Sequence, residues 1–261
     1  AALDEYAATA TYASEPPLFA SKEEYEAFHA RHMSHSVPRV AFSAQCGPVH
    51  IGIDSGSTTV KLVVVDEKSQ ILYTNYQPNL GNPLPLIREQ LLKIYKEHPG
   101  LQVASVTTTG YGEELVKNAF RCDYGLVETV AHFTAAKYFM PDVDFIIDIG
   151  GQDIKAISID GQGAVKNFLM NDKCAAGTGR FLEMMAKTLG LSLEEMSVKG
   201  LEWKHNIVIS SMCTVFAESE VVSLVAQNKD VADIIHGLNV SVASKVGALA
   251  ARLGKDHPGE Y

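Results

Sequence analysis

The chain has 261 residues, of which 46% are hydrophobic, 20% charged and 8% aromatic. This composition excludes an intrinsically disordered protein and provides enough apolar side chains for one large domain or two small ones. The 22 Lys and Arg against 31 Asp and Glu give a formal net charge of −9, which excludes a nucleic-acid-binding protein with a dominant basic face.

The sequence shows no sign of a secretion signal or of a membrane-spanning segment. The N-terminus, Ala1 to Glu5, lacks a basic segment followed by an apolar run, and no apolar stretch in the sequence approaches bilayer length. The four cysteines are too few and too widely spaced for a secreted disulfide framework. We therefore expect a cytoplasmic protein without nucleic-acid or membrane partners.

The predicted elements alternate along the chain. Residues 1–47 predict a lead-in segment with one capped helix over Ser21–His32. Further on, the hydrophobic periodicity predicts strands from His50 and over 60–65, 71–76, 103–108, 145–149, 154–160, 164–170 and 207–210. It predicts helices over 82–98, 113–120, 128–139 and 231–253. This alternation is typical of the α/β class.

The sequence contains an internal repeat. Ile53–Asp66 aligns without a gap on Ile147–Asp160, with matching Ile, Asp, Gly, Lys and closing Asp. Each copy has an acidic residue at the end of a strand, then a turn of small residues, then a strand leading away. We call Asp54–Thr58 the first turn and Asp148–Asp153 the second turn.

Turns of this kind bind anions, because several backbone N–H groups can converge on phosphate oxygens where side chains are small. Two such turns facing each other would clamp a polyphosphate, while Asp54 and Asp148 would hold Mg²⁺ directly or through water. Nucleotide hydrolysis is the chemistry that this predicts. The candidate phosphate-binding residues are Ser55, Gly56, Ser57, Thr58, Lys61, Gly150, Gly151, Gln152 and Asp153.

A plainer interpretation is that both turns are tight hairpins, since Gly and Ser are common turn formers. Lys61 and Lys155 follow the turns on strands, where a lysine is more often a solvated edge residue than a phosphate ligand. Neither the G-x-x-x-x-G-K-[ST] pattern nor the dinucleotide pattern G-x-G-x-x-G occurs in the chain.

Three motifs carry a resemblance to a known family: IDIGGQD (147–153), NDKCAAGTGRF (171–181) and CTVFAESEV (213–221). They resemble the activators of 2-hydroxyacyl-CoA dehydratases and the ATPase subunits of benzoyl-CoA reductases, within the superfamily of acetate and sugar kinases, actin and the seventy-kilodalton heat-shock chaperones. The resemblance covers about His50 to Gly254.

The resemblance implies a two-lobed, actin-like ATPase fold of the ribonuclease H type with duplicated β-meander lobes. The lobes are expected over 48–140 and 141–261, the second carrying the cluster cysteines. Family members continue into a strand and a Gly-Gly turn that packs against adenosine. Because no such motif precedes Tyr261, we expect the adenosine-binding portion to be missing and the chain to be a fragment or a shortened member.

Cys174 and Cys213 each lie just ahead of, or at the start of, a predicted helix, a setting that favours the thiolate, which binds iron. A 4Fe-4S cluster takes four thiolates, so two copies would share one cluster on a twofold axis, and the resemblance implies the same arrangement. A buried thiol or a zinc site are the alternatives, although neither C-x-x-C nor a histidine at ligand spacing accompanies the pair. Cys46 and Cys122 are interpreted as structural, unless all four cysteines of one chain meet.

The resemblance further implies an ATP-dependent one-electron donor to a dehydratase or reductase, refilled by ferredoxin or flavodoxin and working as a homodimer or a tandem pseudo-dimer. Glu128 opens a helix between the two turns, with His132 one turn later. A superfamily carboxylate in this helix faces the nucleotide, and Gln152 is a candidate for orienting water. A small-molecule kinase of the same superfold and a non-catalytic module remain alternatives.

Overall fold

The computed structural model describes residues 19–34, 36–43, 47–171, 177–210 and 213–253. The chain divides into two compact units, residues 1–38 and 39–261. The described part of the first unit contains helix α2 (Lys22–Ser34). Its start is capped, because Ser21 Oγ accepts from the Glu24 N–H at 3.2 Å and the Glu24 carboxylate accepts from the Ala20 N–H at 2.7 Å. The capped helix predicted for this segment is thereby confirmed.

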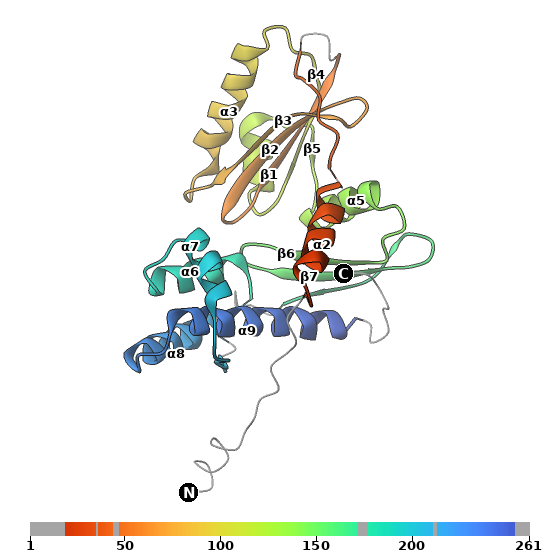
Figure 1. Ribbon diagram of the computed structural model, residues 1–261. Helices are drawn as coiled ribbons and strands as arrows, with labels where there is room; N and C mark the ends of the chain where they lie inside the picture. Colours follow the sequence, from red (N-terminus) through yellow and green to blue (C-terminus); the bar gives the residue numbers. More distant parts are fainter. Residues whose placement is uncertain (1–18, 35, 44–46, 172–176, 211–212, 254–261) are drawn as a thin grey trace, which may run out of the picture. The chain divides into compact units, whose positions relative to one another are not determined.

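The second unit begins with a five-stranded sheet of order β3-β2-β1-β4-β5 (Figure 1). Its strands are β1 (Val49–Ser55), β2 (Thr59–Asp66), β3 (Ile71–Pro78), β4 (Val103–Thr109) and β5 (Tyr124–Gly125). The first three form an antiparallel meander, and β4 then joins β1 in parallel. Among the strands of the described residues, the sequence patterns missed the two-residue β5, because it is too short to show a period.

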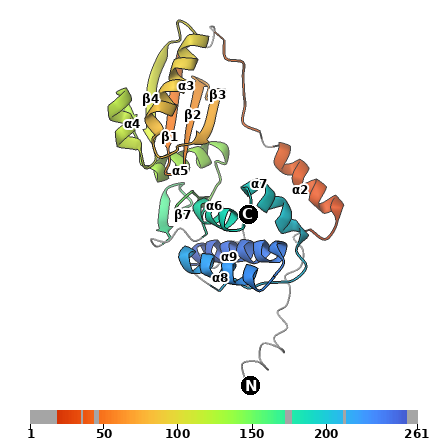
Figure 2. The same cartoon turned by 90° about the vertical axis from the view of Figure 1, so that its left-hand side faces the viewer.

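One face of this sheet is apolar because side chains alternate along β1 and β2. Helices α3 (Pro83–Glu97) and α4 (Glu113–Phe120) supply buried side chains to the same core, and α3 runs along the sheet in both ribbon views (Figures 1 and 2). The core side chains are Val49, Ile51, Ile53, Val60, Leu62, Val64, Leu72, Ile87, Ile94, Val116 and Cys122.

Helix α5 (Glu128–Phe139) leads into a three-stranded antiparallel sheet of order β6-β7-β8. Its strands are β6 (Phe145–Ile149), β7 (Ile154–Ile159) and β8 (Val165–Met170). Every residue of the central strand β7 is buried, including the polar Lys155 and Ser158. A strand buried on both faces shows no alternation of polar and apolar burial.

The two meanders repeat each other in register, which confirms the internal repeat. Asp54 lies opposite Lys61 across the β1–β2 ladder, and Asp148 lies opposite Lys155 across the β6–β7 ladder. Each turn is closed by one backbone hydrogen bond at the equivalent place, of 2.9 Å in the first turn and 2.8 Å in the second. The aligned residues are therefore structurally equivalent as well as similar in sequence.

The equivalence extends to the far end of each hairpin. Asp66 Oδ1 accepts from two backbone N–H groups of the turn that follows it, and Asp160 Oδ1 accepts from the two equivalent N–H groups. The second ladder of each copy also has its register shift at the equivalent position. The closing aspartate matched in the sequence thus has a shared structural role, which is to cap the second turn of its meander.

Most of the described residues after β8 are helical, which agrees with the helix expected after each motif cysteine and with the helix predicted over 231–253. The helices are α6 (Gly179–Thr188), α7 (Leu193–Lys199), the 3₁₀ helix η1 (Gly200–Glu202), α8 (Thr214–Ala226) and α9 (Val231–Ala251). Their shared core contains Phe181, Met185, Ala186, Met196, Ile209, Ala217, Val221, Ile234, Ile235 and Leu238. Helices α8 and α9 lie side by side in both views (Figures 1 and 2).

The strand predicted over Ile207–Ser210 is wrong, since these residues form no ladder. The apolar pattern arises because the segment packs on helices: Ile209 is buried in the helical core, and the Ile207 carbonyl lies against Gly237 of α9. The Ser210 N–H donates to the Glu220 carboxylate at 3.0 Å, where a strand would donate to a neighbouring strand.

Helix α9 is long and apolar enough, by length and composition alone, to cross a membrane. Core helices pass the same test, and the N-terminal half of α9 contributes three fully buried side chains to the helical core. Asp233, also on this half, is 4% exposed and accepts from the N–H groups of Lys204 and His205. Core packing therefore accounts for the apolar character of this half.

The two glycines of α9 give a matched test of this packing. A Cβ at Gly237 would collide with the Ile207 carbonyl oxygen, whereas a Cβ at Gly247 meets nothing within 4 Å. Gly237→Ala is expected to lower the free energy of unfolding by about 1–3 kcal/mol, and Gly247→Ala to raise it by about 0.5–1 kcal/mol, because alanine favours the helix. Urea denaturation of both variants measures this; equal signs for the two substitutions would contradict the packing described.

Candidate functional site

The first turn begins with Asp54 and Ser55, which are the last two residues of strand β1. Lys61 Nζ forms an ion pair with Asp54 Oδ2 at 2.8 Å. The loop after β4 lies over the turn, since the Gly112 N–H donates to the Ser55 carbonyl at 2.9 Å. Gly110, with φ of 88°, allows this approach, because a Cβ there would lie 2.5 Å from Asp54 Oδ1.

Two polar atoms at the first turn lack hydrogen-bond partners within the described chain. Asp54 Oδ1 and Ser55 Oγ are both fully buried and unpaired. Buried polar atoms of this kind are few in folded proteins and call for an explanation such as a ligand or an ion. The two unpaired atoms are compatible with a polar group bound at the first turn, and phosphate binding there stays a prediction.

The second turn is built around a buried lysine. Lys155 is 4% exposed, and its Nζ lies 3.5 Å from Glu128 Oε2, 3.4 Å from Asp148 Oδ2 and 3.2 Å from Asp153 Oδ1. The expectation of a solvated edge lysine is wrong here, because β7 is the central strand and is covered on both faces. Burial alone lowers the pKa of Lys155, but the three carboxylates overcome this effect and raise it.

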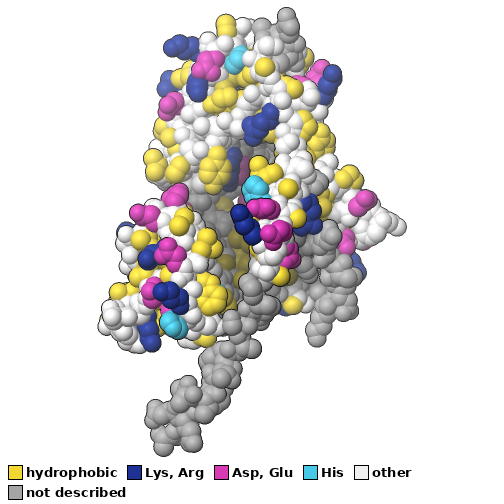
Figure 3. Space-filling model, viewed as in Figure 1, with side chains coloured by type: hydrophobic (Ala, Val, Ile, Leu, Met, Phe, Trp, Pro, Cys, Tyr) yellow, Lys and Arg dark blue, Asp and Glu magenta, His cyan; other side chains and the backbone are white. Residues whose placement is uncertain are grey.

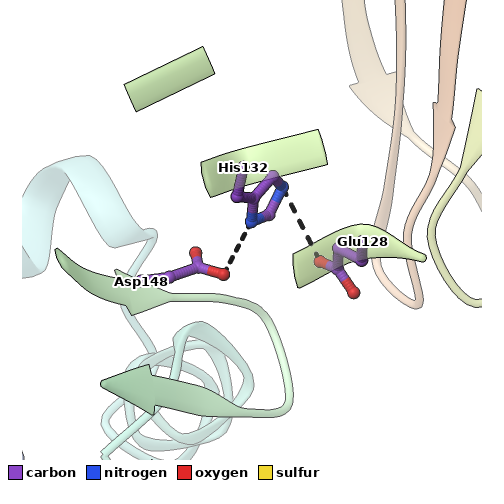
Figure 4. Close-up of side chains that lie close together, drawn as sticks. All are labelled: Glu128, His132 and Asp148. Atoms are coloured by element: carbon purple, nitrogen blue, oxygen red, sulfur yellow. Dashed lines mark hydrogen bonds and ion pairs between the residues drawn. The ribbon is translucent and has the colours of Figure 1, made fainter. Parts of the chain in front are cut away.

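His132 lies between Asp148 and Glu128, as Figure 4 shows. Its Nδ1 is 2.6 Å from Asp148 Oδ2, and its Nε2 is 3.9 Å from Glu128 Oε1. Glu128 and His132 are one helical turn apart on α5, so both side chains point from one face of the helix towards β6.

The His132–Asp148 contact shifts both pKa values. The hydrogen bond to Asp148 raises the pKa of His132, against the effect of burial. Burial works against ionisation of Asp148, but the His132 hydrogen bond and charge, together with Lys155, lower its pKa. Both effects favour an ionised pair.

The structure brings the two turns into contact. Gly151 packs against the Thr58 side chain, and the hydroxyl of Tyr111, from the loop after β4, donates to Asp153 Oδ2 at 3.3 Å. Burial, followed by the Asp153 charge, raises the pKa of that hydroxyl. Gln152 is exposed on the second turn.

The predicted site residues are distributed over one carboxylate cluster, one ion pair and the two turns. Glu128, Asp148 and Asp153 converge on Lys155, whereas Asp54 pairs with Lys61 in its own hairpin. The remaining predicted phosphate-binding residues, Ser55, Gly56, Ser57, Thr58, Gly150, Gly151 and Gln152, lie on the two turns themselves.

Tyr111 and His132 contact the predicted site residues but were not among the site residues predicted from the sequence. Two signals were present: the glycines that flank Tyr111 directly after a strand, and the spacing of four between Glu128 and His132.

Cys213 is the N-cap residue of α8 and is half-buried, as expected for the start of a helix. Cys174 lies outside the described residues. Cys122 is buried after α4 in the first core, where burial raises its pKa, in accord with a structural role. The helix that follows the Cys174 segment is bonded to the second turn: the Gly179 and Arg180 N–H groups of α6 donate to the Gly150 and Gly151 carbonyls at 3.1 and 2.8 Å.

The sequence model of the BadF/BadG/BcrA/BcrD ATPase family matches residues 51–259. The chain belongs to this family. The fold class predicted from the resemblance, an α/β fold of the actin-like ATPase type, is confirmed by the solved structures of relatives that it matches.

Two curated family relatives show how close the similarity is. The chain is 38% identical over 208 residues to a 2-hydroxyisocaproyl-CoA dehydratase activator of Clostridioides difficile, a match that covers 78% of this chain and 76% of the relative. It is also 38% identical over 207 residues to the (R)-2-hydroxyglutaryl-CoA dehydratase activating ATPase of Acidaminococcus fermentans, covering 78% of each.

A solved structure of the Clostridium difficile activator with bound ADPNP superposes with a TM-score of 0.70 at 36% identity. The superposition covers 80% of this chain and 78% of that one. The similarity thus extends from the sequence to the arrangement of the elements.

The His132–Asp148 pair gives the site a pH-dependent stability. The contribution of His132, whose pKa is raised, is fully present below pH 6.5 and is lost as the pH rises through the raised value. That of Asp148, whose pKa is lowered, is present above pH 3.8 and is lost as the pH falls through the lowered value.

His132→Gln is therefore expected to cost about 1 kcal/mol of unfolding free energy at pH 5.5, after allowing for solvent screening of a side chain that is one third exposed, and clearly less at pH 9. Denaturant titrations of metal-free protein at both pH values measure this. In the matched variant Asp148→Asn, the NMR titration of His132 should shift to lower pH; an unshifted titration would refute the pairing.

Proposed function

We propose that this chain is an ATP-dependent one-electron donor that activates a 2-hydroxyacyl-CoA dehydratase or a related acyl-CoA reductase. The observation that carries the proposal is the direct bonding of α6 to the second turn. A turn suited to nucleotide phosphates is joined by two backbone hydrogen bonds to the helix that starts five residues after Cys174. The proposed phosphate-binding turn and the segment that carries a proposed cluster ligand would thus be linked through α6.

The nucleotide would lie between the two turns. Ser55, Gly56, Ser57 and Thr58 with Lys61 would hold phosphate oxygens on one side, and Gly150, Gly151, Gln152 and Asp153 on the other. The unpaired buried Asp54 Oδ1 fits a group bound at the first turn. The relative solved with bound ADPNP supports ATP and ADP as the ligands.

Magnesium fits the same place, because carboxylate oxygens are the ligands that this hard cation prefers. Asp54 and Asp148 would hold Mg²⁺, directly or through its waters. Each of these aspartates is oriented by the lysine of its own hairpin. Glu128 and Gln152 would orient the attacking water, with Glu128 held in place by Lys155 and by His132 on the same helix.

Cys174 and Cys213 would bind the cluster. The position of Cys213 at the N-cap of α8 suits a thiolate, since the free N–H groups of a helix start favour negative charge. A 4Fe-4S cluster held by these cysteines and by their counterparts in a second copy accepts and donates one electron at a time. The second copy would be another chain or a tandem domain.

The lobe boundaries, the electron donor and the cellular location are proposed from the family resemblance. The lobes are assigned to 48–140 and 141–261, with 1–47 as a lead-in segment. The donor would be a ferredoxin or a flavodoxin, and the location cytoplasmic. On the face shown in Figure 3, Lys and Arg side chains are interspersed with Asp and Glu.

Anaerobic purification tests the cluster. The protein should be brown, lose its colour in air and contain about two iron atoms and two sulfides per chain if two copies share one cluster. Cys174→Ser and Cys213→Ser should each abolish the colour, while Cys46→Ser and Cys122→Ser should keep it. Colour retained in both motif variants would overturn the ligand assignment, and wild-type protein that stays colourless after reconstitution would favour a kinase or a non-catalytic module.

The contact between the turns tests the nucleotide site. A Cβ at Gly151 would lie 2.8 Å from Thr58 Cγ2 and closer still to its hydroxyl, whereas a Cβ at Gly179 makes only ordinary contacts beyond 3.5 Å. Gly151→Ala should therefore weaken ATP binding by roughly tenfold or more, about 1.4 kcal/mol, and Gly179→Ala by no more than about twofold. Calorimetry measures both; equal affinities in the two variants would show that the turns do not act together.

A further inference from the structure

The side chains around His132 have the spacing of a metal-binding site. One ligand atom each from Glu128, His132 and Asp148 lies within 4.8 Å of the other two (Figure 4). One imidazole nitrogen with two carboxylate oxygens is a donor set that suits Mn²⁺, Fe²⁺, Co²⁺ or Zn²⁺ better than Mg²⁺. Considered alone, this trio would be expected to bind a transition metal.

A cation of the protein itself already lies among these ligands. Lys155 Nζ contacts Glu128 and Asp148, which are two of the three, and also Asp153. The groups that face one another here are the carboxylates of Glu128, Asp148 and Asp153 and the cations of Lys155 and His132, with the Tyr111 hydroxyl bonded to Asp153. The ammonium thus balances charge that a metal would otherwise balance.

The ammonium is held at this position by burial and by its three carboxylate partners. Lys155 is the second residue of β7, a strand that is buried along its whole length, and the side chain is 4% exposed. A divalent ion bound by Glu128 and Asp148 would lie beside this fixed positive charge, where like-charge repulsion is strong because water is largely excluded.

We propose that Lys155 is a positioning residue whose ammonium takes the place of a metal ion among Glu128, His132 and Asp148, and so excludes a divalent cation from that trio in the nucleotide-free protein. Before any ligand binds, the ammonium holds the carboxylates of Glu128, Asp148 and Asp153 together. A consequence, which rests on the proposed function, is that the divalent cation enters this region only together with the nucleotide phosphates.

The first copy of the repeat provides an internal comparison. The equivalent Lys61 pairs with Asp54 alone among the described acidic groups, and its side chain is 40% exposed. Removal of this lysine leaves one carboxylate without its ion pair and creates no cluster of ligands.

The test measures Mn²⁺ binding by electron paramagnetic resonance in the absence of nucleotide. Lys155→Met, which keeps the shape of the side chain and removes its charge, should bind one Mn²⁺ at least tenfold more tightly than the wild type. The bound Mn²⁺ should show hyperfine coupling to an imidazole nitrogen. That coupling should vanish in Lys155→Met/His132→Gln.

Matched controls separate this effect from a general change of charge. Lys155→Arg keeps the cation and should bind Mn²⁺ as weakly as the wild type, and Lys61→Met should neither tighten binding nor produce the nitrogen coupling. The proposal is overturned if Lys155→Met binds Mn²⁺ no more tightly than the wild type, or if nucleotide-free wild-type protein already shows the imidazole coupling.

An imidazole coupling in nucleotide-free wild-type protein would overturn the proposal even if Lys155→Met does not fold. In that case Lys155→Met/Asp153→Asn, which removes one negative charge together with the positive one, serves as the second variant and should gain the coupled Mn²⁺ signal. None of these readouts requires ATP hydrolysis or a cluster, so they separate failure of this proposal from failure of the proposed function.

Discussion

A buried ammonium among three carboxylates is the interaction on which this site depends. Lys155 of β7 joins Glu128 at the start of α5, Asp148 near the end of β6 and Asp153 at the end of the second turn. Removal of one member of such a group leaves an uncompensated charge in a place with little water, which is far more costly than the loss of a surface ion pair. The geometry of the second turn is therefore tied to the position of α5.

The two copies of the meander place the same hairpin in two different environments, one open to solvent and one buried. Both copies place a lysine opposite the aspartate that ends the first strand, and both close the turn with the same backbone bond. In the first copy the lysine reaches solvent, whereas in the second copy the central strand is covered on both faces. The difference between Lys61 and Lys155 thus comes from the surrounding helices and not from the hairpin.

That difference also marks what sequence could predict. Period-two burial on β1 and β2, the capped start of α2 and the gapless repeat are local patterns, and they were confirmed. The burial of Lys155 depends on elements far away in the chain, so the hairpin alone favoured a solvated lysine. Likewise, Ile207–Ser210 is apolar because it lies on α9, and a short apolar run cannot distinguish this from a strand.

Two backbone hydrogen bonds connect the second turn to α6. The carbonyls of Gly150 and Gly151 accept from the N–H groups of Gly179 and Arg180 at the start of α6, so the position of the turn is linked directly to the position of the helix. Because the carboxylate cluster fixes Asp148 and Asp153 on either side of those two glycines, the turn is held at both ends. A displacement of the turn by a ligand would then be passed to α6 and not absorbed within the loop, and this is the property that coupling between a nucleotide and the Cys174 segment requires.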